Sequence, residues 1–250
     1  MALFKSGNPA LNKETFSHCE TSLDEADVMT IDGTVNKTAF LLLLTIVSAI
    51  LTWRFFSVTA NYGLIGKCVL ISSIVGVIIA FFVSFNKDLS ALLTPIYAFF
   101  EGIALGGISL VMEQAYPGIV NQSLLLTFSI FIVLLVIYKA KLIAVTENLK
   151  LIIASATAGI AFYYLLSLVF RLVGVQLPLI HESTVGGIFF SVFVVIIAAM
   201  NLVVDFDFIE QGAASHVPKY MEWYGAFGLL VTVIWLYVEI LRLLGKSRRK

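Results

Sequence analysis

The chain alternates between long apolar blocks and short polar connections. Seven apolar segments can be marked, each close to the length of about 20 residues that an α-helix needs to cross a bilayer. They run over Thr38–Phe56, Leu64–Phe85, Ala91–Met112, Ile119–Tyr138, Leu149–Phe170, Val185–Phe208 and Trp223–Leu244. Because the apolar residues form continuous blocks rather than an alternating pattern, they predict helices and not a β-barrel. We expect an all-α, polytopic membrane protein with seven transmembrane helices.

The connections leave no room for a separate soluble domain. Tyr116-Pro117-Gly118 predicts a tight turn, and Thr146 is a plausible helix N-cap before the fifth segment. Gly102 and Gly106 form a GxxxG pair in the third segment, a spacing that lets helix backbones approach closely in lipid. We predict a polar, mobile tail over residues 1–37, a transmembrane domain over 38–245 and a basic tail over 246–250.

Composition supports the membrane assignment and narrows the chemistry. Hydrophobic residues make up 60% of the chain and charged residues 13%, whereas soluble domains carry about 25% charged residues. The balance of 16 basic and 16 acidic residues argues against a nucleic-acid partner. Two cysteines and three histidines, none in an HExxH pair, make no metal set, and no GxSxG or P-loop motif occurs. We expect no enzyme and no cofactor.

The distribution of basic residues does not determine the orientation of the chain in the membrane. With seven spans the termini lie on opposite sides, and the basic residues divide eight to eight between the two sides. The positive-inside rule therefore does not decide. All the loops on the N-terminal side are basic, which favours a cytoplasmic N-terminal tail.

The acids inside the apolar segments are the candidate functional residues, because an ionisable group in the bilayer is costly and functional by default. Glu101 lies near the middle of the third segment, and Asp205 lies late in the sixth. Asn201 shares a helix face with Asp205, one turn earlier. Asp207 falls on nearly the opposite face, so only one of the two aspartates can point into the bundle. We predict that Asp205 points inward and that Asp207 is interfacial.

Glu239 is the acid of the seventh segment, on the C-terminal side of its middle. Arg171 ends the fifth segment on that same side, so a structural Glu239–Arg171 ion pair competes with a gating role for Glu239. Helix rise places Asp205 and Glu239 in opposite halves of the bilayer, about 20 Å apart.

Several stretches resemble the Bax-inhibitor (transmembrane Bax-inhibitor-motif) family, in its bacterial branch. The stretches cover nearly the whole chain beyond the tail. They are Asp32-Gly33-Thr34-Val35-Asn36-Lys37-Thr38, Leu142-Ile143-Ala144-Val145-Thr146-Glu147, the run from Asp205 to Gly212, Pro218-Lys219-Tyr220-Met221-Glu222-Trp223-Tyr224, and Trp235-Leu236-Tyr237-Val238-Glu239-Ile240-Leu241-Arg242.

The resemblance implies a seven-helix bundle with the last helix near the centre, acting as a calcium-leak channel of the bacterial cell (inner) membrane. In relatives, a carboxylate on the sixth helix and another on the seventh share a proton and sense pH. These acids correspond to Asp205 and Glu239. In a register that preserves the Leu-Arg-Leu-Leu-Gly ending, Thr232 takes the second position. The second segment offers only Lys67 where relatives carry a buried acid and arginine, so Glu101 is a substitute partner for Asp205.

Two functions follow as hypotheses. The first is a pH-sensitive calcium leak, in which close carboxylates share a proton that Ca²⁺, with its preference for oxygen ligands, can replace. Asp205 would then be a Ca²⁺ ligand, and Ca²⁺ the transported ion. The second is a non-conducting regulator of other membrane proteins, such as a membrane protease, with the acidic tail as its docking element. A purely structural role for the buried acids also stays open.

Overall fold

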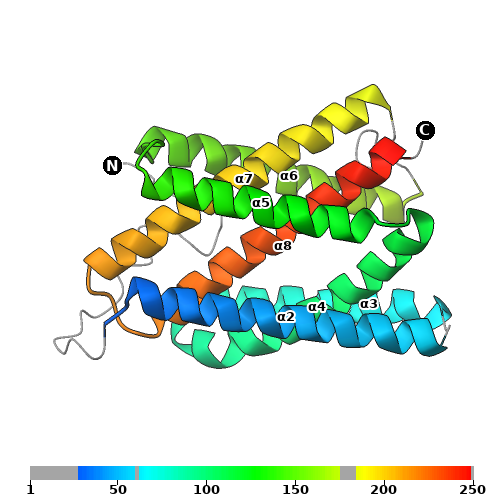
Figure 1. The fold of residues 1–250 in the computed structure, drawn as a ribbon, viewed down its shortest axis with the longest axis horizontal. Helices are drawn as coiled ribbons and strands as arrows, with labels where there is room; N and C mark the ends of the chain where they lie inside the picture. The colour runs from blue at the N-terminus through cyan, green and yellow to red at the C-terminus, as the bar shows by residue number, and fades with distance from the viewer. Residues whose placement is uncertain (1–27, 60–61, 175–183, 249–250) are drawn as a thin grey trace. The chain divides into compact units, whose positions relative to one another are not determined.

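The computed structural model describes residues 28–59, 62–174 and 184–248. Within these ranges seven long α-helices follow one another, and each is long and apolar enough to cross a membrane (Figure 1). They are α2 (Ile31–Thr59), α3 (Tyr62–Phe85), α4 (Ser90–Ala115), α5 (Ile119–Lys139), α6 (Glu147–Leu172), α7 (Val185–Ala214) and α8 (Met221–Arg248), with the 3₁₀ turn η2 (Lys87–Leu89) before α4. The prediction of an all-α protein with seven spanning helices is confirmed.

Two local signals act as the sequence predicts. Gly118 adopts a left-handed backbone (φ 81°) that few other residues tolerate, and it forms the turn between α4 and α5. Thr146 caps α6, because its hydroxyl accepts a hydrogen bond from the Leu149 amide at 3.2 Å. Both connections therefore begin their helices at a defined residue.

Helix α2 begins earlier than the apolar pattern predicts. Its first residue is Ile31, whereas the predicted segment starts at Thr38. Thr30 explains the difference, because its hydroxyl accepts a hydrogen bond from the Gly33 amide at 3.0 Å and so satisfies the first turn. The last residues of the predicted polar tail are thus helical. Residues 1–27 of that tail lie outside the described part of the chain.

The described chain divides into two units. The N-terminal unit contains residues 28–117 together with Phe208–Leu230, and the C-terminal unit contains Gly118–Asp207 together with residues 231–248. Helices α7 and α8 each contribute to both units.

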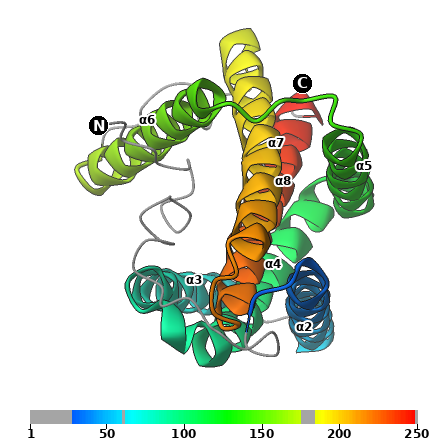
Figure 2. The ribbon, with the colours of Figure 1, turned by 90° about the vertical axis from the view of Figure 1, so that its left-hand side faces the viewer.

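In the N-terminal unit, α4 lies between α2 and α3 (Figure 2). Small residues of α4 make these contacts. A Cβ added at Gly102 or Gly106 would overlap the backbone of α2, at Thr45 or Ala49 respectively, and one at Gly107 would overlap a valine side chain of α3. Close approach in lipid needs such residues. The GxxxG pair therefore packs two helices together.

In the C-terminal unit, α7 contacts α5, α6 and α8. A buried cluster of Ile160 from α6 with Val194 and Ile197 from α7 packs against Trp235 of α8. On α5, the Phe131 ring lies 5.7 Å from the ring of Phe206, edge to face. Figure 1 shows α6 and α8 running in one direction and α7 in the opposite direction.

Helix α8 is the most buried of the seven spanning helices. The buried share of its apolar window is 67%, against 17% for α3, α5 and α6. In the N-terminal unit its Phe227 ring stacks edge to face on Tyr97 of α4, with 5.0 Å between centroids. In the C-terminal unit Trp235 joins the core cluster. Helix α8 therefore contributes buried side chains to the core of each unit.

The α2–α4 contact yields a stability prediction. Gly106→Ala should lower the free energy of unfolding by about 1–3 kcal/mol, because the new methyl group meets the backbone of α2 rather than a movable side chain. Gly66→Ala in α3 is the control, since nothing lies within 4 Å of its Cβ position. The control should be neutral or slightly stabilising. Chemical unfolding in detergent micelles measures both, and equal losses would contradict the packing role.

Candidate functional site

Asp205 and Asn201 occupy the interior of the protein, one turn apart on α7. The Asp205 side chain is fully buried, at 0% exposure, and Asn201 is buried as well. The Asn201 amide donates hydrogen bonds to the Thr157 hydroxyl of α6 at 2.8 Å and to the Ile197 carbonyl at 2.9 Å. This burial agrees with the prediction that Asp205 is the inward acid of the sixth segment.

Asp207 lies at the edge of the C-terminal unit. Its carboxylate forms an ion pair of 2.6 Å with Lys150, which stands in the first turns of α6 beside Glu147. The Asp207 side chain keeps 15% of its surface exposed. Since Lys150 belongs to the charged start of α6, this pair fits the interfacial position predicted for Asp207.

Glu239 is held in a hydrogen-bonded network of its own. The Arg242 guanidinium donates to both carboxylate oxygens, at 2.9 and 3.1 Å. The Tyr164 hydroxyl donates at 2.9 Å and the Trp235 indole at 3.3 Å. Because Tyr164 belongs to α6 and the other three to α8, the network ties these helices together.

The Glu239–Arg171 ion pair, one of the two alternatives that the sequence left open for Glu239, is not formed among the described residues. Instead, the Glu239 carboxylate forms an ion pair with Arg242, three residues later on the same helix. Residues three apart are neighbours on a helix, so a local cation satisfies the acid without a second helix. Arg171 is exposed at the last turn of α6.

Contacts with α6 place Asp205 and Glu239 at different levels. Tyr164, which donates to Glu239, also stacks on Phe190 of α7, whereas Asn201 meets Thr157 seven residues earlier on α6. Asp205 therefore lies two to three helical turns from the level of Glu239, which is roughly 10–16 Å along the axis. At that distance the two carboxylates do not share a proton.

Thr232 lies closer to the level of Asp205. Lys246 of α8 donates hydrogen bonds to the Gly187 carbonyl and the Ser191 hydroxyl of α7, which fixes the antiparallel register. Thr232 lies about four turns before Lys246 on α8. The same number of turns forward from the Gly187–Ser191 contact on α7 ends at the turn from Asn201 to Asp205, so Thr232 lies opposite this turn. Thr232 is buried. The assignment of Thr232 to the second sensor position stays a prediction.

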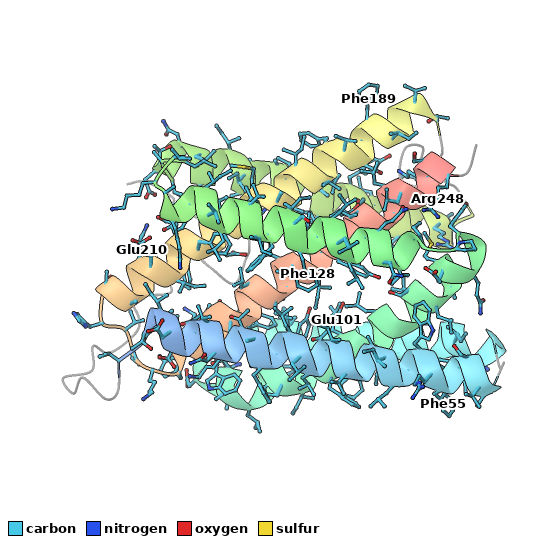
Figure 3. All side chains as sticks on the ribbon, in the orientation of Figure 1. Phe55, Glu101, Phe128, Phe189, Glu210 and Arg248 are labelled. Atoms are coloured by element: carbon cyan, nitrogen blue, oxygen red, sulfur yellow. The ribbon has the colours of Figure 1, made fainter. Side chains whose placement is uncertain are left out.

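Glu101 belongs to the N-terminal unit. It lies near the middle of α4 (Figure 3) and is half-buried. One carboxylate oxygen is 2.9 Å from the point where a Cβ on Gly76 of α3 would lie, so the absent side chain leaves room for the acid. The pairing of Glu101 with Asp205 stays a prediction.

A further buried acid was not singled out from the sequence. Glu222, in the first turn of α8, is 1% exposed and forms an ion pair with Lys37 of α2. It also accepts hydrogen bonds from the Thr30 amide at 2.9 Å and the Thr30 hydroxyl at 2.8 Å. A Cβ at Gly33 would overlap its carboxylate. We call these four residues the Glu222 clamp.

The clamp joins two of the stretches that carry the family resemblance. Gly33 and Lys37 come from the stretch before the first apolar segment, and Glu222 comes from the stretch before the last. The sequence signal for this clamp was an acid and a lysine in separate polar stretches. A glycine stands one turn before the lysine. The Met29 amide reinforces the junction by donating to the Val217 carbonyl at 2.7 Å.

Among the residues that the structure describes, no three or more His, Cys, Asp or Glu side chains gather closely enough to hold a metal ion. Asp205 is therefore not part of a ready-made carboxylate cluster. Any Ca²⁺ at Asp205 would take its remaining ligands from hydroxyl, amide or backbone oxygens, which Ca²⁺ accepts, or from water.

Seven spanning helices that enclose carboxylates define a multi-pass membrane protein with an ionisable interior. A family model described as Bax inhibitor 1 like matches residues 8–249. The chain belongs to this family. A search among curated proteins found no match.

The Glu222 clamp should be essential for stability. Lys37→Met leaves a buried carboxylate without its cation and should cost about 3 kcal/mol of unfolding free energy. Adding Glu222→Gln removes the unpaired charge and should restore part of the loss. Lys67→Met, at an exposed lysine of α3, is the control and should change stability by less than about 0.5 kcal/mol. A loss as small as that of the control would refute the clamp.

The separation of Asp205 from Glu239 can be tested by a double-mutant cycle. The stability changes of Asp205→Asn and Glu239→Gln should add to within about 0.5 kcal/mol, as distant sites do. Glu239→Gln and Tyr164→Phe share a hydrogen bond and should not add. A coupling of about 1 kcal/mol or more between Asp205 and Glu239 would show that they form a pair after all.

Proposed function

We propose that this protein is a pH-sensitive leak channel for cations, Ca²⁺ in particular. The observation that carries the proposal is the complete burial of Asp205 inside a spanning helix. A charged carboxylate in such a place is costly, and its protonated form is not. A change of pH that adds or removes this proton alters the energy of the packing around α7. The same ionised carboxylate attracts Ca²⁺.

The neighbours of Asp205 support a gating role. Two buried polar residues lie near its level: Asn201 on its own helix and Thr232 opposite on α8. Hydroxyl and amide groups can hydrogen-bond to either protonation state of a carboxyl group. Neither Asn201 nor Thr232 carries a charge, so these neighbours would not fix the charge of Asp205, which a sensor requires.

The ion pairs on either side would act as fixed points. Asp207 holds α7 to the start of α6 through Lys150, and the Arg242–Glu239–Tyr164 network holds α8 to the middle of α6. Protonation at Asp205 would then shift the stretch of α7 and α8 between these anchors rather than the whole helices. Such a local charge change biasing a two-state element is a common form of switch.

The other sequence candidates take supporting roles in this proposal. Glu101, half-buried in α4, is a second acid that a permeating cation could meet. Glu239 is assigned to anchoring, and Arg171 to the surface of the protein. We place the protein in a bacterial cell membrane with the N-terminal tail in the cytoplasm, without enzymatic activity or a resident cofactor.

Calcium flux into liposomes tests the proposal. Wild-type protein should pass Ca²⁺ above the level of empty liposomes, with a rate that changes between about pH 5 and pH 8. In Asp205→Asn the ratio of the rates at the two ends should approach one, because the amide cannot titrate. Glu210→Gln, an exposed acid on the same helix, should behave like the wild type.

Two outcomes would overturn this function. Flux no greater than that of empty liposomes at every pH would exclude a channel, and an unchanged pH profile in Asp205→Asn would exclude the sensor. In the first case the regulator hypothesis gains support if deleting residues 1–27 abolishes binding to a membrane protease. That deletion spares Thr30, so the Glu222 clamp stays intact.

A further inference from the structure

Helix α4 carries a row of polar side chains along one side. The row consists of Ser90, Thr94, Tyr97 and Glu101. Residues three or four positions apart lie on the same side of an α-helix, so these four share one face. From Ser90 to Glu101 the row extends about 16 Å along the helix axis, which is about half the thickness of the hydrocarbon core. We call it the polar face of α4.

The polar face points into the N-terminal unit. The Ser90 hydroxyl donates to the Tyr220 carbonyl at 3.1 Å, and the Tyr97 ring packs edge to face against Phe227 of α8. Both contacts lie within this unit. The opposite side of the helix is apolar and open to the surroundings, with exposed fractions of 65%, 39% and 43% at Leu92, Ile96 and Phe99. The polar face is therefore the side of α4 turned away from lipid.

Three groups on the polar face have no hydrogen-bond partner among the described residues. The Thr94 hydroxyl is one of them, although its side chain is fully buried, at 0% exposure. In the described part of the chain the Tyr97 hydroxyl and the Glu101 carboxylate form no hydrogen bond either, and Glu101 forms no ion pair there. Buried polar groups nearly always have a partner, either in the protein or in ordered water. Three in one row point to water as their partner.

The groups nearest to Glu101 do not neutralise its charge. Helix α3 presents Gly76, and the point where its Cβ would lie is 2.9 Å from a Glu101 oxygen and 3.8 Å from the Tyr97 ring. Helix α2 approaches the next residue, Gly102, through the backbone of Thr45. Acids inside spanning helices face the bundle interior or a water-filled cavity, and they mark ion pathways. Water and a cation are therefore the ligands that suit Glu101.

We propose that the polar face of α4 is hydrated and forms an entry path for cations, from the end where α4 begins to Glu101 in the middle of the span. Helices α2 and α8 begin at the same end, because Met29 donates to Val217 and Ser90 to Tyr220. Hydroxyl and carboxylate oxygens are the ligands that Ca²⁺ prefers. The identity of the permeating ion rests on the proposed function, whereas the hydration of this face does not.

Hydroxyl-radical footprinting of the full-length protein in liposomes tests the hydration. X-ray pulses produce the radicals from water, and mass spectrometry measures the oxidation of each aromatic residue. Tyr97 should be oxidised several-fold faster than Phe99, although Tyr97 is 6% exposed and Phe99 is 43% exposed. Phe99 is a matched control, because it is an aromatic residue of the same helix on the lipid side. Equal rates, or a faster rate at Phe99, would overturn the proposal.

A double variant tests whether the polar groups hold the water. Thr94→Val with Glu101→Leu should lower the oxidation rate of Tyr97 several-fold, because an apolar face does not retain water. Neither change removes a hydrogen bond between described residues, so the variant should fold. Ile96→Val, on the lipid side, is the control and should keep the wild-type rate. A Tyr97 rate unchanged in the double variant would contradict the hydrated path.

Calcium flux into liposomes tests the role of Glu101 in the path. Glu101→Gln should lower the flux several-fold at both pH 5 and pH 8 and keep the ratio between them, because Asp205 is intact. Oxidation of Tyr97 without any flux would overturn the proposed function and support the hydrated face. Flux with Tyr97 oxidised no faster than Phe99 would overturn the hydrated face and leave the proposed function standing.

Discussion

A charged side chain inside the hydrocarbon of a membrane is stable only when the protein supplies its partners, and the rest of this structure follows from that constraint. Glu222, Glu239 and Asp207 each meet a cation within their own unit. Two of these pairs also join separate helices: α2 to α8 and α6 to α7. The third is local to α8, but Tyr164 extends it to α6. The acids therefore connect helices, in addition to the apolar and small residues and to hydrogen bonds such as that from Asn201 to Thr157.

The partners of the buried acids distinguish two roles, anchoring and the proposed pH sensing. An acid fixed by a cation and several donors, such as Glu239, has its charge stabilised and is suited to anchoring. Asp205 lies between two anchored points of the C-terminal unit, and α8 presents Thr232 near its level rather than an acid. In the proposed function, a proton-dependent change in this unit depends on Asp205.

Much of the fold could be predicted because each spanning helix carries its own signal. Hydropathy located the seven helices, the GxxxG spacing marked a face of α4 that allows close backbone approach, and helical periodicity separated Asp205 from Asp207. The sequence predictions that failed concern features that depend on contacts between side chains in the folded protein. Helix α2 starts in a polar stretch because Thr30 caps it and a residue far along the chain, Glu222, pairs with its lysine. Depth alone suggested Arg171 as an alternative partner of Glu239, although Arg242, a cation one turn away on the same helix, was nearer.

The central claim is that Asp205 is the carboxyl group whose protonation changes with pH in this protein. Infrared difference spectroscopy of the reconstituted protein, between about pH 8 and pH 5, measures this directly through the carbonyl band of protonated carboxylic acids. We predict that one component of this band disappears in Asp205→Asn and persists in Glu239→Gln, whose parent carboxylate forms an ion pair with Arg242. A spectrum unchanged by Asp205→Asn, or one that loses its component in Glu239→Gln, would contradict the account.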